Sequence, residues 1–200
     1  MATGDYCTLA EIKQRLWPEG SEPDNVSDAI LTNIITAVSR QIDLICERRF
    51  YTTVADETRY FTTADSEYIW PDLDIISITS IAIDEDMGRT YGTTLATTDY
   101  DLLPDNAALD SKPYSYIRVA PLGTERFPTH QKGVKIGGKF GWSAIPASVK
   151  EACLIQVERV WKRKDSPFGI ISNPAGGDMR LIEKLDPDVQ VLLWNYRKWV

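Results

Sequence analysis

The spacing of apolar residues changes twice along the chain, and each change marks a boundary between helical and strand-forming sequence. From about residue 27 to residue 49 the apolar residues recur every three or four positions, which predicts a long amphipathic helix. These residues are Ile30, Ile34, Val38, Ile42 and Ile45, and Leu31, Ile35 and Cys46 widen the same stripe. Between residues 51 and 140 apolar and polar residues alternate between turn-forming residues, which predicts short strands. Helical spacing returns at Pro146.

Capping residues place the starts of the first two helices. Thr8 and Glu11 have the spacing of a capping box at the head of a short helix that ends at Leu16. Ser27 or Asn25 can cap the long helix that follows.

Two prolines place the last two helices. Pro146 suits the first turn of a third helix, and Asp186 followed by Pro187 begins a fourth. The order of elements predicts an α+β fold in which an antiparallel β unit is inserted into a small bundle of about four helices. We expect one composite domain with the N-terminal bundle helices in residues 1–50, the inserted β unit in 51–140 and the C-terminal bundle helices in 141–200.

The β unit contains six segments with the alternation of strands. They are Glu57–Phe61, Tyr68–Trp70, Ile75–Ile83, Tyr100–Leu103, Tyr116–Ala120 and Gly133–Phe140. Asp84 to Gly88 is a candidate hairpin turn. Residues 93–98 and the Pro/Gly/Ser-rich stretch 165–177 are expected to be loops.

The charge of the chain argues against binding nucleic acid through its phosphates. The 200 residues carry a net charge of -7, and residues 51–140 alone, with 14 acidic and 8 basic residues, carry -6. A protein that grips phosphates should be basic. No uninterrupted apolar run approaches the roughly 20 residues of a membrane helix, so no membrane association is expected.

Few residues offer catalytic or metal-binding chemistry. Cys7, Cys46 and Cys153 are widely spaced, which predicts buried thiols in a reducing compartment. His130 is the single histidine, so a zinc site or a histidine-based triad is not expected. The carboxylates of Asp72, Asp74, Asp84, Glu85 and Asp86 lack the spacing of a calcium loop and are expected to form acidic turns.

One segment comes close to a phosphate-binding loop. Gly133 to Lys139 matches the first seven positions of that motif, but Phe140 stands where the Ser or Thr that holds magnesium belongs. Val134 and Ile136 alternate as in a strand, so a strand is expected here. No catalytic, cofactor-binding or metal-binding residue is assigned, and an enzyme is not expected.

Several strings of residues carry a resemblance to one protein family. These strings are Thr8–Leu16, Asp28–Phe50, Gly133–Trp142 with Ile145–Lys150, Trp161–Ser166 and Pro187–Arg197, and together they contain 65 of the 200 residues. They resemble the opening helix, the long helix, the last strand leading into the third helix, and the C-terminal part of the head–tail connector, or adaptor, proteins of tailed bacteriophages.

The resemblance implies a structural virion protein of the neck, at the head–tail junction, made in the cytoplasm of the bacterial host. Connector proteins form a ring, usually twelve-fold, under the portal protein. The ring extends the DNA channel, through which DNA passes without specific binding, and docks the next neck or tail-completion protein. The family's C-terminal segment meets the portal, which transfers that interface to Pro187, Trp194, Tyr196, Arg197 and Trp199.

The basic end of the third helix is a second candidate surface. Arg159, Lys162, Arg163 and Lys164 can contact a neighbouring subunit or another partner, or they can simply complement the helix dipole. Two functions compete with the connector. One is another neck or tail-completion protein, and the other is a small nucleotide-binding enzyme that uses Gly133–Lys139.

Overall fold

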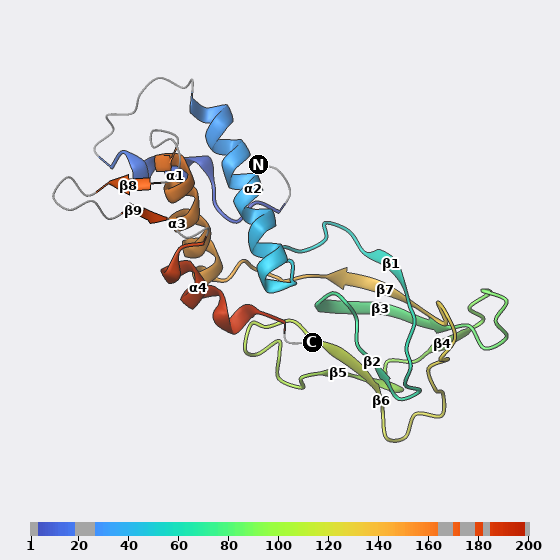
Figure 1. Cartoon of the computed structure of the whole chain (residues 1–200). Coiled ribbons are helices and arrows are strands. Elements are labelled where there is room, and N and C mark those ends of the chain that lie inside the picture. The colour runs from blue at the N-terminus through green and yellow to red at the C-terminus, as the bar shows by residue number, and fades with distance from the viewer. Residues whose placement is uncertain (1–3, 19–26, 164–169, 173–178, 182–184, 199–200) are drawn as a thin grey trace. The chain divides into compact units, whose positions relative to one another are not determined.

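The computed structural model describes residues 4–18, 27–163, 170–172, 179–181 and 185–198 of the chain. These residues form four α-helices and antiparallel sheets, which confirms the expected α+β class (Figure 1). The chain divides into two compact units: a helical unit, Met1–Arg48 with Ile145–Val200, and a β unit, Arg49–Ala144.

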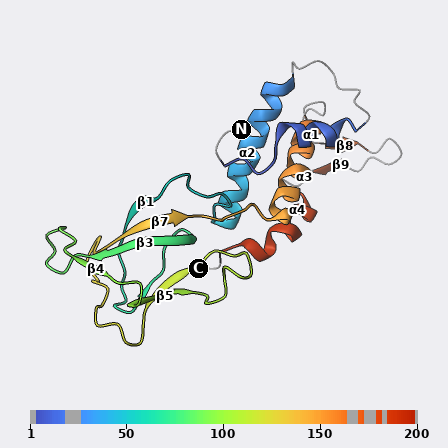
Figure 2. The same cartoon turned by 180° about the vertical axis from the view of Figure 1, so that it is seen from behind.

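The helical unit is organised around its third helix. Its helices are α1 (Leu9–Leu16), α2 (Asp28–Cys46), α3 (Ala147–Arg163) and α4 (Pro187–Leu193), which continues into the 3₁₀ turn η3 (Trp194–Tyr196). Helix α3 contacts all three other helices, and it runs beside α2 in both views (Figures 1 and 2). A short hairpin, β8 (Ile170–Ser172) with β9 (Met179–Leu181), lies where the sequence suggested only a loop.

Local capping chemistry explains where most of the helices begin. The Thr8 hydroxyl accepts from the Glu11 N–H at 3.1 Å and the Glu11 carboxylate accepts from the Thr8 N–H at 3.0 Å, so the predicted capping box is confirmed. Of the two residues expected to cap α2, Ser27 has a helical backbone and makes no capping hydrogen bond, and Asn25 lies outside the described residues. Helix α2 ends at Cys46, earlier than expected, because Glu47 adopts a left-handed conformation with φ 52°.

The side of α2 that faces the core differs from the predicted stripe. Its buried apolar residues are Leu31, Ile35, Val38, Ile42 and Cys46. Ile30, which the spacing placed in the core, is 53% exposed, and Ile34 and Ile45 are half-buried. The helix is therefore apolar on two sides, and the neighbouring helices cover one of them.

The same helix meets a length and composition criterion for a membrane span. Among the described residues, α2 is the one helix that does so, although Asp28, Arg40 and Asp43 interrupt its apolar residues. The evidence for a span is weak, because the core helix of a soluble protein meets the same criterion. Arg40 and Asp43 form an ion pair within the helix, and the Tyr6 hydroxyl donates to Asp43.

The three cysteines are free and buried, as predicted. The sulfur atoms of Cys7 and Cys153 lie 3.5 Å apart, although 146 positions separate them in the sequence. The hydrogen bond with Cys153, together with burial, raises the pKa of Cys7, and burial raises the pKa of Cys46 to about 11. Both thiols are therefore protonated at neutral pH and pack as small apolar groups.

The β unit consists of two antiparallel sheets that share one core. The first sheet has the order β1 (Glu57–Phe61), β7 (Val134–Phe140), β3 (Ile75–Ile83), β4 (Thr93–Leu95). The second has the order β2 (Tyr68–Ile69), β6 (Tyr116–Val119), β5 (Tyr100–Leu103). All six predicted strands agree with the structure to within one residue, and Gly133–Phe140 is confirmed as a strand. Strand β4 falls where a loop was expected.

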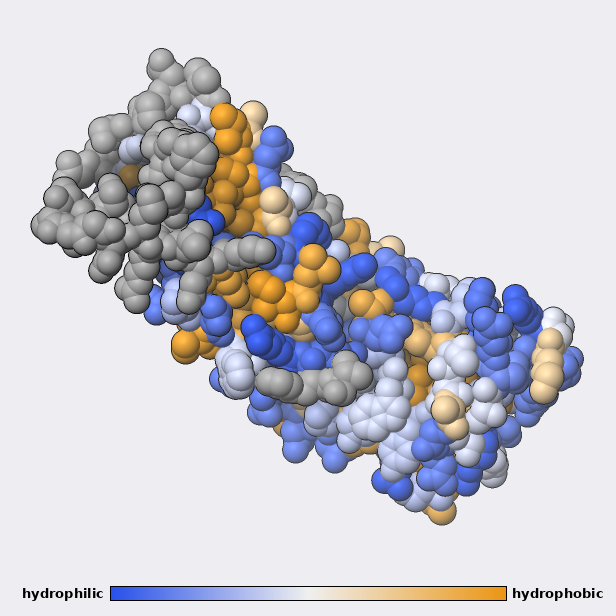
Figure 3. All heavy atoms as spheres, in the orientation of Figure 1, coloured by the Kyte–Doolittle hydropathy of each residue, from blue (hydrophilic) through white to orange (hydrophobic). Residues whose placement is uncertain are grey.

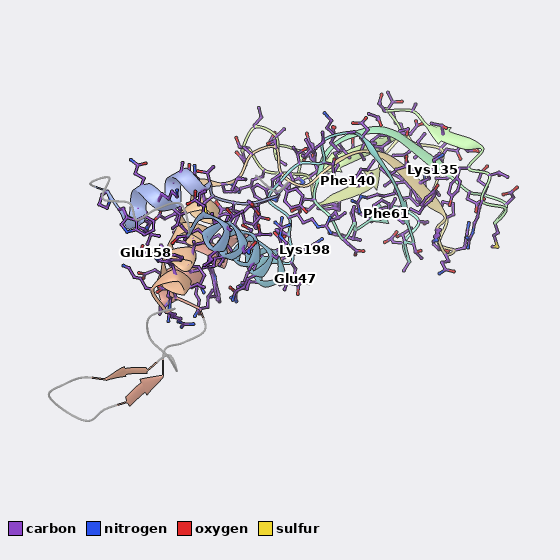
Figure 4. The ribbon with its side chains drawn as sticks, turned by 90° about the horizontal axis from the view of Figure 1, so that it is seen from above. Glu47, Phe61, Lys135, Phe140, Glu158 and Lys198 are labelled. Atoms are coloured by element: carbon purple, nitrogen blue, oxygen red, sulfur yellow. The ribbon has the colours of Figure 1, made fainter. Side chains whose placement is uncertain are left out.

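Apolar side chains from both sheets fill the space between them. Ile75, Ile81 and Phe140 of the first sheet share this core with Ile117 and Val119 of the second. The Phe61 and Phe140 rings lie 6.4 Å apart on the paired strands β1 and β7 (Figure 4). Strand β3 carries β-bulges that shift its register with β7, which is why its alternation of buried and exposed residues is incomplete.

Candidate assembly surfaces

The C-terminal helix is held in place by its own helical unit. Val189 and Leu193 are fully buried, and the Lys198 N–H donates to the Cys46 carbonyl at 3.0 Å. This segment was predicted to meet the portal. On it, Val191 is 74% and Trp194 55% exposed.

The structure places four of the five predicted portal residues on this one segment. Pro187 begins α4 and is exposed, while Tyr196 and Arg197 are half-buried. The Arg197 guanidinium lies 5.6 Å from the centre of the Trp194 ring. Trp199 lies outside the described residues. The sequence argument missed Val191, although its spacing from Pro187 places both on one face of the helix.

The basic residues of α3 are engaged inside the helical unit. Arg159 binds the Asp186 carboxylate at 2.9 Å, and Lys162 binds Glu158 at 2.6 Å, one turn away on the same helix. Arg15 of α1 also binds Glu158, at 2.7 Å (Figure 4). The charges therefore tie α1, α3 and the start of α4 together. Arg163 is half-buried at the end of α3, and Lys164 lies outside the described residues.

The ion pairs shift the pKa values of Glu158 and Arg15. Burial alone would raise the pKa of Glu158, but hydrogen bonds from Lys162 and Arg15 outweigh it and lower that pKa below its usual range. Hydrogen bonds to Glu158 and Glu151 raise the pKa of Arg15. Glu158 and Arg15 are therefore both charged at neutral pH.

Asp186 has two roles that a pair of variants can separate. Its carboxylate accepts from the Asp188 N–H at 3.0 Å, which caps α4, and it binds Arg159. We expect Asp186→Ala to destabilise α4 by about 1–2 kcal/mol, because it loses both contacts. Asp186→Asn keeps a capping side chain and should lose less than half of that.

Hydrogen exchange of the α4 amides measures the difference. Protection should fall about tenfold in Asp186→Ala for a loss of 1.4 kcal/mol. Equal protection in the wild type and Asp186→Ala would show that packing of Val189 and Leu193 alone holds the helix.

The second sheet of the β unit carries an aromatic platform that the sequence argument did not find. In the register of β2 with β6, Tyr68 lies opposite Arg118, and Trp70, one residue beyond β2, continues this face beside Tyr116. The Trp70 and Tyr116 rings stack with their centres 4.4 Å apart, and Arg118 lies 5.5 Å from the Tyr68 ring centre. Trp70 is 65% exposed. The sequence did contain a signal for this platform: Tyr68 and Trp70 are two positions apart on a predicted strand, so their side chains point to the same face.

The residues singled out for chemistry have structural roles in the β unit. Strand β7 pairs with a neighbour on each side, so Gly133–Lys139 does not form the loop that would cradle a phosphate. Asp74 accepts a hydrogen bond from the Trp142 indole at 2.8 Å. Among the described residues, no group of three or more His, Cys, Asp or Glu side chains is arranged to hold a metal ion.

Asp84 gives the β unit a specific dependence on pH. Its buried carboxylate accepts from the Arg89 N–H at 3.0 Å and lies 3.1 Å from the His130 imidazole. Burial alone would raise the pKa of Asp84, but these hydrogen bonds lower it below its ordinary value of 3.8. A carboxyl group with a lower pKa in the folded chain stabilises the fold above its unfolded pKa. This contribution is lost as the pH falls through the folded pKa.

Urea unfolding of the wild type and Asp84→Asn between about pH 6 and pH 2.5 tests this expectation. The wild type should lose more stability than the variant below about pH 4, because the amide cannot titrate. Parallel curves for the two proteins would contradict it.

Comparisons with known proteins identify the fold. No family model matches the chain, and no curated protein matches it. Three solved structures of gene transfer agent particles contain similar chains, and in each the similarity covers 100% of this chain.

The first is the neck of an empty particle computed with C6 symmetry, with 17% identity, 94% of that chain covered and a TM-score of 0.57. The second is the neck of a native particle computed with C12 symmetry, with 17% identity, 93% covered and a TM-score of 0.58. The third is the virion of the native particle, with 18% identity, 93% covered and a TM-score of 0.54. At these identities the likeness shows a shared fold along the whole chain.

Proposed function

We propose that the chain is a structural protein of the neck of a tailed, phage-like particle, in which copies of it form a ring. The observation that carries this proposal is the match of fold over the entire chain to chains from neck assemblies with C6 and C12 symmetry. The order of helix, long helix, β unit and C-terminal helices, which led to the connector family from the sequence, supports the same assignment.

Within the neck, the role we propose is that of the head–tail connector. A ring of about twelve copies lies under the portal protein, extends the DNA channel and docks the next neck or tail-completion protein. The net charge of -7 supports a conduit, because an acidic wall repels the phosphates of passing DNA and does not hold them. The two units then work as one composite domain, with no catalytic step.

We place the portal contact on the exposed side of the C-terminal segment. Val191 and Trp194 supply apolar area there, and Arg197 and Tyr196 lie next to them. Tryptophan, tyrosine and arginine are the residues that most often dominate the affinity of protein interfaces. The basic end of α3 is a weaker candidate for a partner, because Arg159 and Lys162 already bind acidic residues of the same unit.

Binding to tailless, DNA-filled particles of the parent virus tests the proposal. The full-length chain should sediment with the particles at a small fixed number of copies that saturates near twelve. A truncation ending at Asp186 removes α4, but it also removes the buried Val189 and Leu193 and can unfold the unit. A surface variant, Val191→Glu with Trp194→Ser, avoids that problem because both side chains are exposed.

The binding results distinguish the connector from the two alternative functions. Loss of binding in the surface variant, with Leu122→Glu as a control at a 95% exposed leucine, supports the portal contact. Binding by every variant keeps the connector and moves the contact elsewhere. If the wild type does not bind particles that still accept tails, another neck or tail-completion protein becomes the better assignment. ATP titration of the wild type and Lys139→Ala tests the nucleotide-binding alternative, which equal or absent binding removes.

A further inference from the structure

Helix α2 carries a second, mostly apolar stripe, which the other described residues of its unit leave partly exposed. Ile30, Ile34, Ala37, Gln41 and Leu44 follow one another at intervals of three or four residues, which places them in one line along the helix. This line lies about a third of a turn away from the buried stripe. Ile30 is 53% and Leu44 80% exposed. Figure 3 shows apolar residues gathered along α2.

Part of this stripe forms a groove with α3. The groove has a volume of about 330 Å³ and is lined by Ile30, Ile34, Ala37 and Val38 of α2, by Val160 of α3, and by the amides of Asn33 and Gln41. None of these side chains is charged, although 26% of the residues in the chain are. The amides supply hydrogen-bonding groups at an otherwise apolar surface.

The composition of α2 shows that this surface is unusual for a monomer. The mean hydropathy of an 18-residue window of α2 is 1.3, but only 33% of that window is buried in the folded chain. An apolar stripe on a helix is normally covered by other parts of the protein or by a partner. An exposed apolar surface of this kind typically marks an interface.

Charge favours a second copy of the chain as the occupant. Two copies each carry a net charge of -7 and repel each other, so their contact is most favourable where the surface is uncharged. In a ring, every copy presents one surface to one neighbour and a different, complementary surface to the other, so an uncovered apolar groove can form one side of that contact. The geometry points to the α2 groove as the site at which the neighbouring copy docks in the ring. This inference rests on the proposed function.

A matched pair of variants on α2 tests the inference. Ala37 lines the groove, whereas Ala29 is exposed on the same helix and does not line the groove. Ala37→Glu places a charge in the contact, and we expect at least a tenfold loss of copies bound to particles at a concentration that saturates the wild type. Ala29→Glu adds the same charge outside the groove and should bind like the wild type. Thermal unfolding of both variants checks that they are folded.

A photo-crosslinking amino acid at position 30 of the full chain identifies the occupant on assembled particles. We expect covalent dimers of the chain, and none from a control position at Leu122. Cross-links only to the portal protein, to another neck protein or to lipid would overturn the inference, as would normal assembly of Ala37→Glu. Either of these two results would leave the proposed function intact, provided that a fixed number of wild-type copies binds to each particle. Failure of the wild type to bind would instead reject the proposed function itself.

Discussion

Replacing Gly141 with alanine is expected to unfold the β unit or to destabilise it by about 4 kcal/mol or more. Gly141 follows β7 with φ +102°, a conformation that residues with a side chain rarely adopt. A Cβ atom at this position would lie 2.0 Å from the carbonyl oxygen of Tyr51, which is backbone and cannot rotate away. The Gly141 N–H also donates to the Asp74 carbonyl at 2.7 Å, so relieving the clash breaks a buried hydrogen bond.

Urea unfolding followed by tryptophan fluorescence measures this loss. Trp142 is next in the chain, its ring centre lies 5.3 Å from that of Phe50, and its indole N–H donates to Asp74, so its fluorescence reports directly on the site. Gly92→Ala is the matched control, because nothing lies within 4 Å of a Cβ added there. We expect that control to change stability by less than about 0.5 kcal/mol. Equal stability of the two variants would contradict the steric account of Gly141.

Two neighbouring residues of α2 should differ widely in their contribution to stability. Leu31 is fully buried and Ile30 is 53% exposed. We expect Leu31→Ala to cost about 3–5 kcal/mol in the free energy of unfolding, because it removes buried apolar area and leaves a cavity. Ile30→Ala should cost less than about 1 kcal/mol in the isolated chain, because much of its side chain is already in contact with water.

Two measurements distinguish the positions: denaturant unfolding gives the change in stability, and hydrogen exchange gives the protection of the α2 and α3 amides. Similar losses in both variants would mean that the Ile30 side of α2 belongs to the core. If the expected result is obtained, replacing Ile30 changes the stability of the isolated chain only slightly. A loss of assembly in a groove variant then reflects a lost contact and not unfolding.

Much of the fold could be predicted because it depends on local chemistry. The capping box at Thr8 and Glu11 and the proline start at Pro187 involve groups within a few positions of one another. The strands around Ile75–Ile83 were predicted from alternation, which reports on the two faces of a sheet. Strand β4 was not predicted, because its three residues are too few to show an alternation of apolar and polar side chains. They form a strand because they pair with β3.

The candidate surfaces could not be predicted to the same extent, because they depend on which residues distant parts of the chain cover. From the sequence, the basic residues of α3 could complement the helix dipole or contact a partner, and only the structure shows that Arg159 and Lys162 bind Asp186 and Glu158. The aromatic platform became visible only when pairing of β2 with β6 brought Trp70 beside Tyr116.

The sequence by itself determined the class of fold, the order of the elements and most of their ends, because periodicity and capping act within one element. Only the tertiary structure decided which apolar stripe of α2 is core and which is surface. Ile30 and Leu31 are adjacent and equally apolar, and no local rule separates them. Burial depends on where α1 and α3 pack, and those helices cover the Leu31 side of α2 and leave the Ile30 side exposed.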